Sequence, residues 1–575
     1  MKAVLVKIID PFGVFKTSDG KLTFATFFLA ISMLATGASG LVTEYVLSTV
    51  STYILGSSIE QFSITIALML LMMGIASWAQ KFFSDENLIE KFIIVEILLA
   101  ILGGFAPIAM YMAFGFLENH FLLVQYFFIL SIGFLIGFEI PLILRINEKF
   151  SKTLRANIAV VSAADYIGSF LGAWIWVKFL LKKFPLTEIG FILAILNFGV
   201  AVITCLYFMK HGLIKNRIIT IISFMIVSAI LWFGFSNNRN WNISAEQKLY
   251  EDKIVFTHTT KYQHLVMTYR ESLDEFRFYI NGNLQFSSLD EKIYHEQLVH
   301  PVMSLASTRK NVLILGGGDG LALREVLKYS NVENISLIDI DYDMVNYCAN
   351  QKELFKLNKD AFKNAKVNVI ESDGVICVDE SKTLYQETGE VVKKREKLQK
   401  IATVKVFNID ADKFAQLSEI KWDVIIVDLP DPNSVELAKL YSRGFYRKLN
   451  NILSKDGIIS VQSTSPYHAK EAYLCIGRTI ESADFKIIPY HDNVPSFGDW
   501  GWYIGYKNHI TDSIMLEKID EVEDFRVETD YLTPELFKRS LVFGKKSLIS
   551  KHDDISTLMY PVILERYIRE SWLVD

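Results

Sequence analysis

The sequence predicts an α-helical transmembrane bundle of about seven spans, fused to a small β subdomain and then to an α/β domain with a Rossmann-like sheet. Three observations predict this order. Residues 1–240 contain repeated long apolar stretches, and residues 241–305 contain a linker and short alternating runs. Residues 306–575 alternate strand-like and helix-like segments and end in a C-terminal extension. A chain of 575 residues exceeds one ordinary domain, so we expect boundaries at these points.

The composition excludes several classes of partner. The formal net charge is −5, and no basic and aromatic patch is present, so we predict no nucleic-acid partner. The four cysteines are scattered without metal-ligand or redox spacing, and we expect them to be reduced and structural: Cys205, Cys348, Cys377 and Cys475. No metal site is predicted.

The first half contains seven stretches that are long and apolar enough to cross a bilayer. They lie at about 23–47, 61–80, 92–116, 121–144, 157–178, 187–209 and 217–235. The first is too long and too uncharged for a cleaved signal peptide, and further stretches follow it. We therefore expect a multi-pass protein in the lipid bilayer of the cell membrane.

The charges around these stretches suggest an orientation. Lys and Arg residues precede the first stretch and follow the second, fourth and sixth, which places the N-terminus in the cytoplasm. Seven full crossings would then leave the second half outside. The fifth stretch is the candidate that does not fully cross, since it contains Asp165 and is followed by Lys178, Lys182 and Lys183.

Four acidic residues lie within or at the ends of these stretches: Glu44, Glu96, Glu139 and Asp165. A carboxyl group in hydrocarbon is costly, so such groups face a partner or a wet cavity, or serve as protonated packing elements. Transport and packing both stay open. Gly168 and Gly172, beside Asp165, predict close helix packing.

The second half begins with a predicted linker and hairpin. Residues 236–250 are polar and unpatterned, as a linker would be. The alternating run Phe276–Ile280 precedes Asn281-Gly282, a strong hairpin signal. The Lys/Glu-rich segment 378–405 interrupts the later strand–helix rhythm and is interpreted as a solvated insertion.

Acidic residues and glycines occupy predicted strand ends in the α/β domain. Val312–Leu315 runs into Gly316-Gly317-Gly318-Asp319-Gly320, where glycine lets the backbone approach a ligand. Asp339 ends the next predicted strand, placed to accept hydrogen bonds from ribose hydroxyls. Asp428 and Asp431 end a later strand, Trp422–Val427. Ligands bind at the carboxyl ends of parallel strands, so we expect these groups to converge.

An ordered series of motifs over residues 250–510 resembles the polyamine aminopropyltransferases, the spermidine synthase family. The series is Tyr262-Gln263, Asn281–Gln285, Asp290-Glu291, Tyr294-His295-Glu296, Gly316–Gly320, Arg324–Val326, Asp428–Pro432, Leu440–Ser442, Phe445-Tyr446, Gln462–Pro466 and Val494–Gly498. The Asp-Leu-Pro-Asp-Pro sequence at Asp428–Pro432 and the apolar first half resemble those of the membrane-fused subgroup.

The resemblance implies a class I methyltransferase-like fold and an aminopropyl transfer. Decarboxylated S-adenosylmethionine would be the co-substrate, and putrescine or a related polyamine amine the acceptor, giving spermidine and methylthioadenosine. No permanently bound cofactor and no metal are implied. The co-substrate is made inside cells, which implies a cytoplasmic catalytic domain despite the charge pattern. Soluble relatives form dimers or tetramers, so a homo-oligomer is expected.

The resemblance also assigns roles to single residues. Asp428 would be the catalytic base and Asp431 would orient the acceptor amine. Tyr294 and Gln263 would position the substrates, with His295 near the nucleoside. The donor site would consist of Gly316, Gly318, Asp319, Asp339 and either Asp373-Gly374 or Asp410-Ala411, of which we favour Asp373. Asp319 would bind the donor ammonium and repel the carboxylate of the intact cofactor.

Two rival functions stay open at this point. A class I methyltransferase shares the fold but does not need paired acids at 428 and 431. A membrane polyamine sensor or transporter would use the soluble half only to bind ligand, and the acids of the apolar half suit it. Phe497 stands where many soluble members have a substrate-contacting tyrosine, so that contact is absent or supplied elsewhere.

Overall fold

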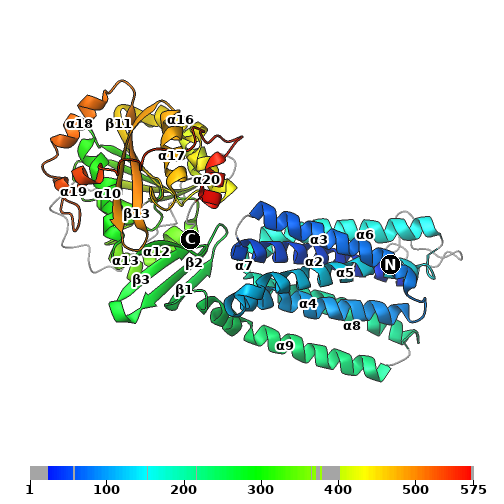
Figure 1. Cartoon of the computed structure of the whole chain (residues 1–575). Coiled ribbons are helices and arrows are strands. Elements are labelled where there is room, and N and C mark those ends of the chain that lie inside the picture. The colour runs from blue at the N-terminus through cyan, green and yellow to red at the C-terminus, as the bar shows by residue number, and fades with distance from the viewer. Residues whose placement is uncertain are drawn as a thin grey trace. The chain divides into compact units, whose positions relative to one another are not determined.

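The computed structural model describes residues 24–55, 58–151, 153–214, 217–363, 366–370, 376–377 and 402–570. The chain divides into two compact units, Met1–Lys253 and Ile254–Asp575. We call them the helical unit and, after the resemblance described above, the catalytic unit, and Figure 1 shows both. The candidate adenine contact Asp373-Gly374 and residues 378–401 of the predicted insertion 378–405 lie outside the described residues.

Among the described residues of the helical unit, seven helices are long and apolar enough to cross a membrane, by length and composition. They are α2 (Phe24–Leu55), α3 (Ser58–Ala79), α4 (Leu88–Phe116), α5 (Phe121–Asn147), α6 (Leu154–Ile175), α8 (Leu186–Lys210) and α9 (Arg217–Gln247). Short elements link them: η1 (Gln80–Phe82), η2 (Glu118–His120), the π-turn η3 (Trp176–Leu180) and α7 (Leu181–Lys183). Each long helix overlaps one of the seven predicted apolar stretches.

Small residues bring these helices into close contact. A Cβ atom at Gly168 would lie 2.0 Å from the carbonyl oxygen of Leu34 on α2, and one at Gly172 would lie 2.6 Å from that of Ala38. The predicted close packing at this small-residue face of α6 is therefore confirmed. Similarly, a Cβ atom at Gly137 of α5 would lie 2.5 Å from the Cα atom of Met73 on α3. These contacts define the α2–α6 and α3–α5 pairs.

The segment 236–247, predicted as a linker, is helical in the structure. It continues α9, which ends at Gln247. The buried Asn238 amide donates to the Thr187 hydroxyl of α8 at 3.2 Å, and Asn242 donates to the same oxygen. The linker prediction was wrong here because the polar residues form contacts between helices, which a local composition signal does not reveal.

The catalytic unit opens with a four-stranded sheet of order β1-β2-β3-β4. Its strands are β1 (Lys253–Thr259), β2 (His264–Arg270), β3 (Glu275–Ile280) and β4 (Asn283–Ser287), with the turn η4 (Glu271–Leu273) before β3. Asn281 and Gly282 have φ values of 49° and 80°, the left-handed pair that a tight hairpin turn requires. The sequence predicted this hairpin from the same dipeptide.

A nine-stranded sheet of order β12-β13-β11-β10-β5-β6-β9-β7-β8 forms the centre of the catalytic unit. Its inner strands are parallel, and β8, β12 and β13 pair antiparallel at the edges. The strands are β5 (Asn311–Gly316), β6 (Asn334–Ile338), β7 (Lys366–Ile370), β8 (Ile376–Cys377), β9 (Thr403–Asn408), β10 (Trp422–Asp428), β11 (Leu453–Gln462), β12 (Phe485–Val494) and β13 (Gly498–Lys507).

Helices cover both faces of this sheet. They are α10 (Glu291–Leu305), α11 (Leu321–Val326), α12 (Tyr342–Asn350), α13 (Lys352–Leu357), α14 (Ala411–Leu417), α15 (Val435–Ala438), η6 (Lys439–Tyr441), α16 (Arg443–Ile452), α17 (Lys470–Glu481), α18 (Asp512–Asp520), α19 (Pro534–Ser540) and α20 (Val562–Glu570). Alternate residues of β5 enter different cores: Val312 and Ile314 one, Leu313 and Leu315 the other. This alternation explains why the strands are continuous apolar runs. The predicted Rossmann-like sheet is thereby confirmed.

Candidate active site

The carboxyl ends of three parallel strands meet at one edge of the sheet. Gly316 of β5 is in register with Asp428 of β10, and Ile338 of β6 is in register with Leu315. The Gly317 amide donates to the Asp428 carbonyl oxygen at 3.1 Å, and the Gly318 amide donates to Oδ2 of Asp339 at 3.1 Å. The glycine turn therefore contacts two of the three strand-end acids that the sequence singled out, Asp428 through its backbone and Asp339 through its side chain.

Two glycines of the turn have no room for a side chain. Gly316 has a φ of +82°, and a Cβ atom there would lie 2.0 Å from the carbonyl oxygen of Asp428. At Gly318, a Cβ atom would lie 2.4 Å from Oδ2 of Asp339. Backbone amides thus approach the acids directly, as nucleotide-binding turns require.

Asp428 accepts a hydrogen bond from the buried hydroxyl of Tyr294 at 2.7 Å. Tyr294 lies on α10, which packs against β10 and β11. Burial, helped by the negative charge of Asp319, raises the pKa of Asp428 to about 6, although His295 and the Tyr294 hydroxyl lower it. Asp428 is therefore a stronger base than an exposed aspartate and is oriented by one phenol.

Asp431 lies three residues on and has three side-chain donors. Gln462 donates to Oδ1 at 3.3 Å, while Thr464 and Tyr567 donate to Oδ2 at 3.2 and 2.9 Å. Burial raises the pKa of Asp431 to about 6, against these hydrogen bonds. Gln462 and Thr464 belong to a motif quoted above. Tyr567 of α20 does not, and nothing in the sequence pattern marked it.

His295 places positive charge beside the acids. Its Nδ1 atom lies 3.0 Å from Oε2 of Glu291 and 2.7 Å from the Glu291 carbonyl oxygen. Burial disfavours the imidazolium, but Glu291, with Asp319 and Asp428 adding to it, raises the pKa of His295 to about 9. Burial raises the pKa of Asp319, whereas the His295 charge lowers it. His295, Asp319 and Asp428 thus form one electrostatic cluster.

A buried ionic network holds α10 against α11. Arg324 binds Glu291 through two nitrogens, at 2.7 and 2.9 Å, and its Nε atom binds Glu325 at 2.6 Å. Glu325 in turn contacts Nε2 of His300 at 2.9 Å. Since Glu291 also contacts His295, this network positions the helix that supplies Tyr294.

Gln263 lies at the end of β6 rather than at the two catalytic-strand acids. Its amide donates to the sulfur of Met344 at 3.0 Å and also interacts with Asp341. Asp341 accepts a hydrogen bond from Thr260 at 2.6 Å. These contacts place Gln263 beside Asp341 and Met344, which follow Asp339 closely in the chain.

Of the two Asp candidates for the adenine, the structure describes Asp410. It follows β9, which pairs with β6, so it lies at the same sheet edge as Asp339. Its Oδ1 accepts from the Lys413 amide at 3.1 Å and caps α14, and its Oδ2 pairs with Lys439 at 2.5 Å. Asp373 and Gly374 lie outside the described residues.

One buried group of three in the described residues has the spacing of a metal site: Glu296, His300 and Glu325, whose ligand atoms lie within 4.8 Å. Each already has protein partners. Glu296 accepts the backbone amides of 530, 531 and 532 at 2.7 to 3.0 Å. His300 bridges Glu325 and the Tyr329 hydroxyl. The group therefore ties the C-terminal segment to α10.

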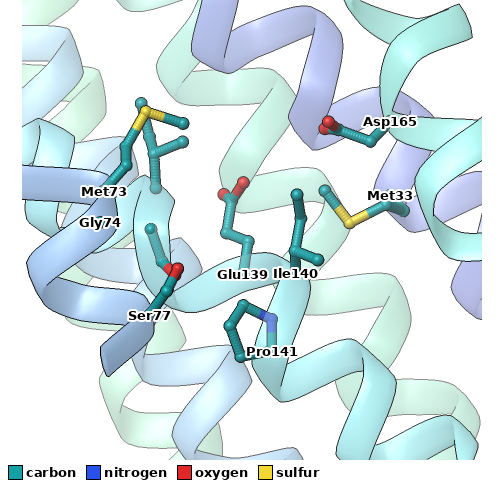
Figure 2. Close-up of a pocket in the computed structure, with 10 residues that line it drawn as sticks. Met33, Met73, Gly74, Ser77, Glu139, Ile140, Pro141 and Asp165 are labelled. Atoms are coloured by element: carbon teal, nitrogen blue, oxygen red, sulfur yellow. The ribbon is translucent and has the colours of Figure 1, made fainter. Parts of the chain in front are cut away.

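The helical unit contains a cavity of about 220 Å³, shown in Figure 2. Glu139 of α5 and Asp165 of α6 line it, together with Met33, Met73, Gly74, Ser77, Ile136, Gly137, Ile140 and Pro141. Glu96 of α4 is buried next to Glu139. Three of the four acids noted in the apolar sequence thus lie in one region of the bundle.

Comparisons with known proteins identify the family of the chain. The family model described as the spermine/spermidine synthase domain matches residues 291–396 and 388–514. A protein of Leptospira interrogans named polyamine aminopropyltransferase is 34% identical over 87% of this chain and 92% of its own length. One of Oceanobacillus iheyensis with the same name is 33% identical over 93% of this chain and 95% of its own length.

Solved structures are more distant. A spermidine synthase in complex with the transition state analogue AdoDATO is 21% identical, with a TM-score of 0.41 over 51% of this chain and 88% of the other. The Leptospira alignment spans 505 residues, more than the catalytic unit contains, so it includes part of the helical unit. On the identity and coverage of these relatives, the chain belongs to the polyamine aminopropyltransferase family.

Proposed function

We propose that the catalytic unit moves the aminopropyl group of decarboxylated S-adenosylmethionine to putrescine or a related amine, giving spermidine and methylthioadenosine. The observation that carries this proposal is the Tyr294–Asp428 hydrogen bond of 2.7 Å beside the second acid, Asp431. A methyltransferase of this fold would not need both acids. The names of the relatives support the same reaction.

The reaction is a displacement at the carbon bonded to the sulfonium. The amine nitrogen forms a bond to that carbon, the carbon–sulfur bond breaks, and its electron pair returns to sulfur as a neutral thioether. The amine arrives protonated and has no lone pair, so it must first lose a proton. In this proposal Asp428 accepts that proton, and its pKa of about 6 leaves it ionised at neutral pH.

The donor would lie along the glycine turn. Asp339, held by the amides of Gly318 and Asp341, would accept hydrogen bonds from the ribose hydroxyls. Asp410 would contact the adenine, because it follows β9, the strand next to β6. Asp319 would bind the donor ammonium and repel the carboxylate of undecarboxylated S-adenosylmethionine.

We also propose that the helical unit spans the cell membrane and that the catalytic unit lies in the cytoplasm. Large apolar side chains on α6 and α9 are widely exposed, among them Tyr166 (73%), Phe170 (68%), Trp232 (73%) and Ile218 (74%). A lipid surface would cover such a face. Protease added to spheroplasts should leave the catalytic unit intact until the membrane is permeabilised. Cleavage in intact spheroplasts would contradict the cytoplasmic location.

The cavity of Figure 2 favours a second candidate function for the helical unit, the binding of a polyamine cation. Glu139 and Asp165 line the cavity, and polyamines carry several positive charges. In equilibrium dialysis with spermidine, the full chain should bind one more ligand than Glu139→Gln, and the exposed control Glu60→Gln should match the wild type. Equal stoichiometry for all three would refute this candidate.

The test of the main proposal uses the full chain purified in detergent. It receives decarboxylated S-adenosylmethionine with a panel of diamines and polyamines, and mass spectrometry follows methylthioadenosine and the new amine. Amine-dependent methylthioadenosine is the expected result and identifies the acceptor. Methyl transfer from intact S-adenosylmethionine, or no product with any amine, would refute the proposal. Light scattering on the same sample would test the expected homo-oligomer.

A further inference from the structure

We propose that Tyr567 of the C-terminal helix α20 is a positioning residue for the acceptor amine, acting through Asp431. The proposal rests on the aminopropyl transfer proposed above. The family model ends at residue 514, so Tyr567 lies beyond the matched domain. Its hydroxyl nevertheless donates to Oδ2 of Asp431 at 2.9 Å, across 136 positions of sequence.

The two oxygens of Asp431 differ in their hydrogen-bonding environment. Oδ2 accepts from both Tyr567 and Thr464, while Oδ1 accepts a longer bond of 3.3 Å from Gln462. The Gln462 amide is shared with the Tyr441 hydroxyl at 2.6 Å, which weakens its hold on Oδ1. A carboxylate has about four lone-pair sites, so Oδ1 keeps capacity for an ammonium ligand. Tyr567 makes the shortest of the three bonds to the Asp431 carboxylate.

The helix that carries Tyr567 is firmly docked. Val562 and Ile563 are buried in the same hydrophobic core as one face of β10. The helix α20 also packs against α15 and α17. Ile563 and Tyr567 are four residues apart and so share one helix face. Arg566 also binds Asp554 at 2.6 Å, and Asp554 binds Arg478 of α17 at 3.3 Å. The phenol is thus presented to Asp431 by a packed element.

A phenol suits this position because it orients the carboxylate without neutralising it. A lysine or arginine at the same place would cancel the charge that attracts a cationic amine. Two further titratable groups of the described residues interact with Asp431, the phenols of Tyr294 and Tyr441, which are neutral as well. The hydrogen bond from Tyr567 lowers the pKa of Asp431 against the effect of burial. It therefore helps keep the carboxylate ionised at neutral pH.

The test is Tyr567→Phe in the full chain, with Tyr560→Phe as the matched control. Tyr560 belongs to the same segment and is 64% exposed. Loss of a hydrogen bond to a charged group predicts an acceptor KM raised about tenfold or more. The donor KM and the affinity for methylthioadenosine should stay unchanged. Calorimetry measures the acceptor affinity as the pH is lowered. In Tyr567→Phe this affinity should begin to fall at a higher pH than in the wild type, because the pKa of Asp431 rises.

A double-mutant cycle with Asp431→Asn separates positioning from folding. In that background Tyr567→Phe should have little further effect on acceptor binding. The inference is overturned if Tyr567→Phe has the same acceptor KM as the wild type and the same pH dependence of acceptor affinity. It is also overturned if donor and acceptor binding weaken together with a lower melting temperature, as a purely structural helix would give. If the wild type binds amine but makes no methylthioadenosine, the proposed function fails while the calorimetric test of Tyr567 still stands.

Discussion

Gly318→Ala should disable nucleoside binding with little effect on the rest of the fold. A Cβ atom at this position would lie 2.4 Å from Oδ2 and 2.8 Å from Cγ of Asp339. Ordinary contact begins near 3.4 Å, so the carboxylate must retreat by roughly 1 Å. Gly318 has no left-handed φ, so the expected effect is a steric displacement of one side chain.

The size of the effect follows from the bonds that this displacement breaks. The Gly318 amide lies 3.1 Å from Oδ2, and a shift of about 1 Å takes the pair beyond hydrogen-bonding distance. Only the Asp341 amide, at 2.8 Å from Oδ1, would still hold the carboxylate. A lost hydrogen bond to a charged group costs about 1.5–3 kcal/mol. This corresponds to about 10- to 150-fold weaker binding of methylthioadenosine.

The assay is calorimetric titration of the full chain in detergent with methylthioadenosine. Gly199→Ala is the matched control, because a Cβ atom at Gly199 of α8 would meet nothing within 4 Å. Circular dichroism should show the same helix content in both variants. Wild-type affinity in Gly318→Ala would refute the assignment of Asp339 to the ribose.

Three further predictions concern the acids and their partners. The kcat/KM of the wild type should decrease when the pH is lowered past about 6, because Asp428 takes up a proton. Tyr294→Phe should move this decrease to higher pH, because the phenol lowers the pKa of Asp428. An unchanged pH profile in this variant would contradict a role of the Tyr294–Asp428 hydrogen bond. Arg324→Met should lower the free energy of unfolding by about 3–5 kcal/mol, since it leaves buried carboxylates uncompensated. Lys310→Met, at an exposed ion pair, should lower it by less than about 1 kcal/mol. Equal losses of the two variants in chemical denaturation would refute the stabilising role of the buried network. Asp319→Asn should narrow the difference in affinity between decarboxylated and intact S-adenosylmethionine, measured by competition, and an unchanged ratio would exclude charge repulsion.

Much of the fold could be predicted because its signals are local. A bilayer-length apolar run, an Asn-Gly turn and a strand ending in a glycine turn each depend on neighbouring residues. The seven long helices, the β3–β4 hairpin and the Gly316–Asp428 edge accordingly appear where they were predicted. Asp428 and Asp339 meet the same glycine turn because parallel strands share their carboxyl ends, and Asp431 follows Asp428 three residues on.

The missed features depend on contacts between distant residues. Tyr567 is one phenol in an amphipathic helix, and only its docking brings it to Asp431. Similarly, Asn238 and Asn242 look like linker residues until Thr187 of another helix accepts their amides. Composition cannot report such partners. Gln263 was predicted by motif to help position the substrates, and its side-chain contacts with Met344 and Asp341 could not be read from that motif.

The most direct test of the account is a single-turnover measurement with Asp428→Asn. The full chain is loaded with decarboxylated S-adenosylmethionine and mixed with putrescine. The reaction is then quenched at set times, and the methylthioadenosine formed is quantified. The account predicts that the variant binds the donor with near wild-type affinity but forms product at least about 100-fold more slowly, as expected for loss of a general base. A wild-type rate in Asp428→Asn would show that another group takes the proton and would contradict the central claim.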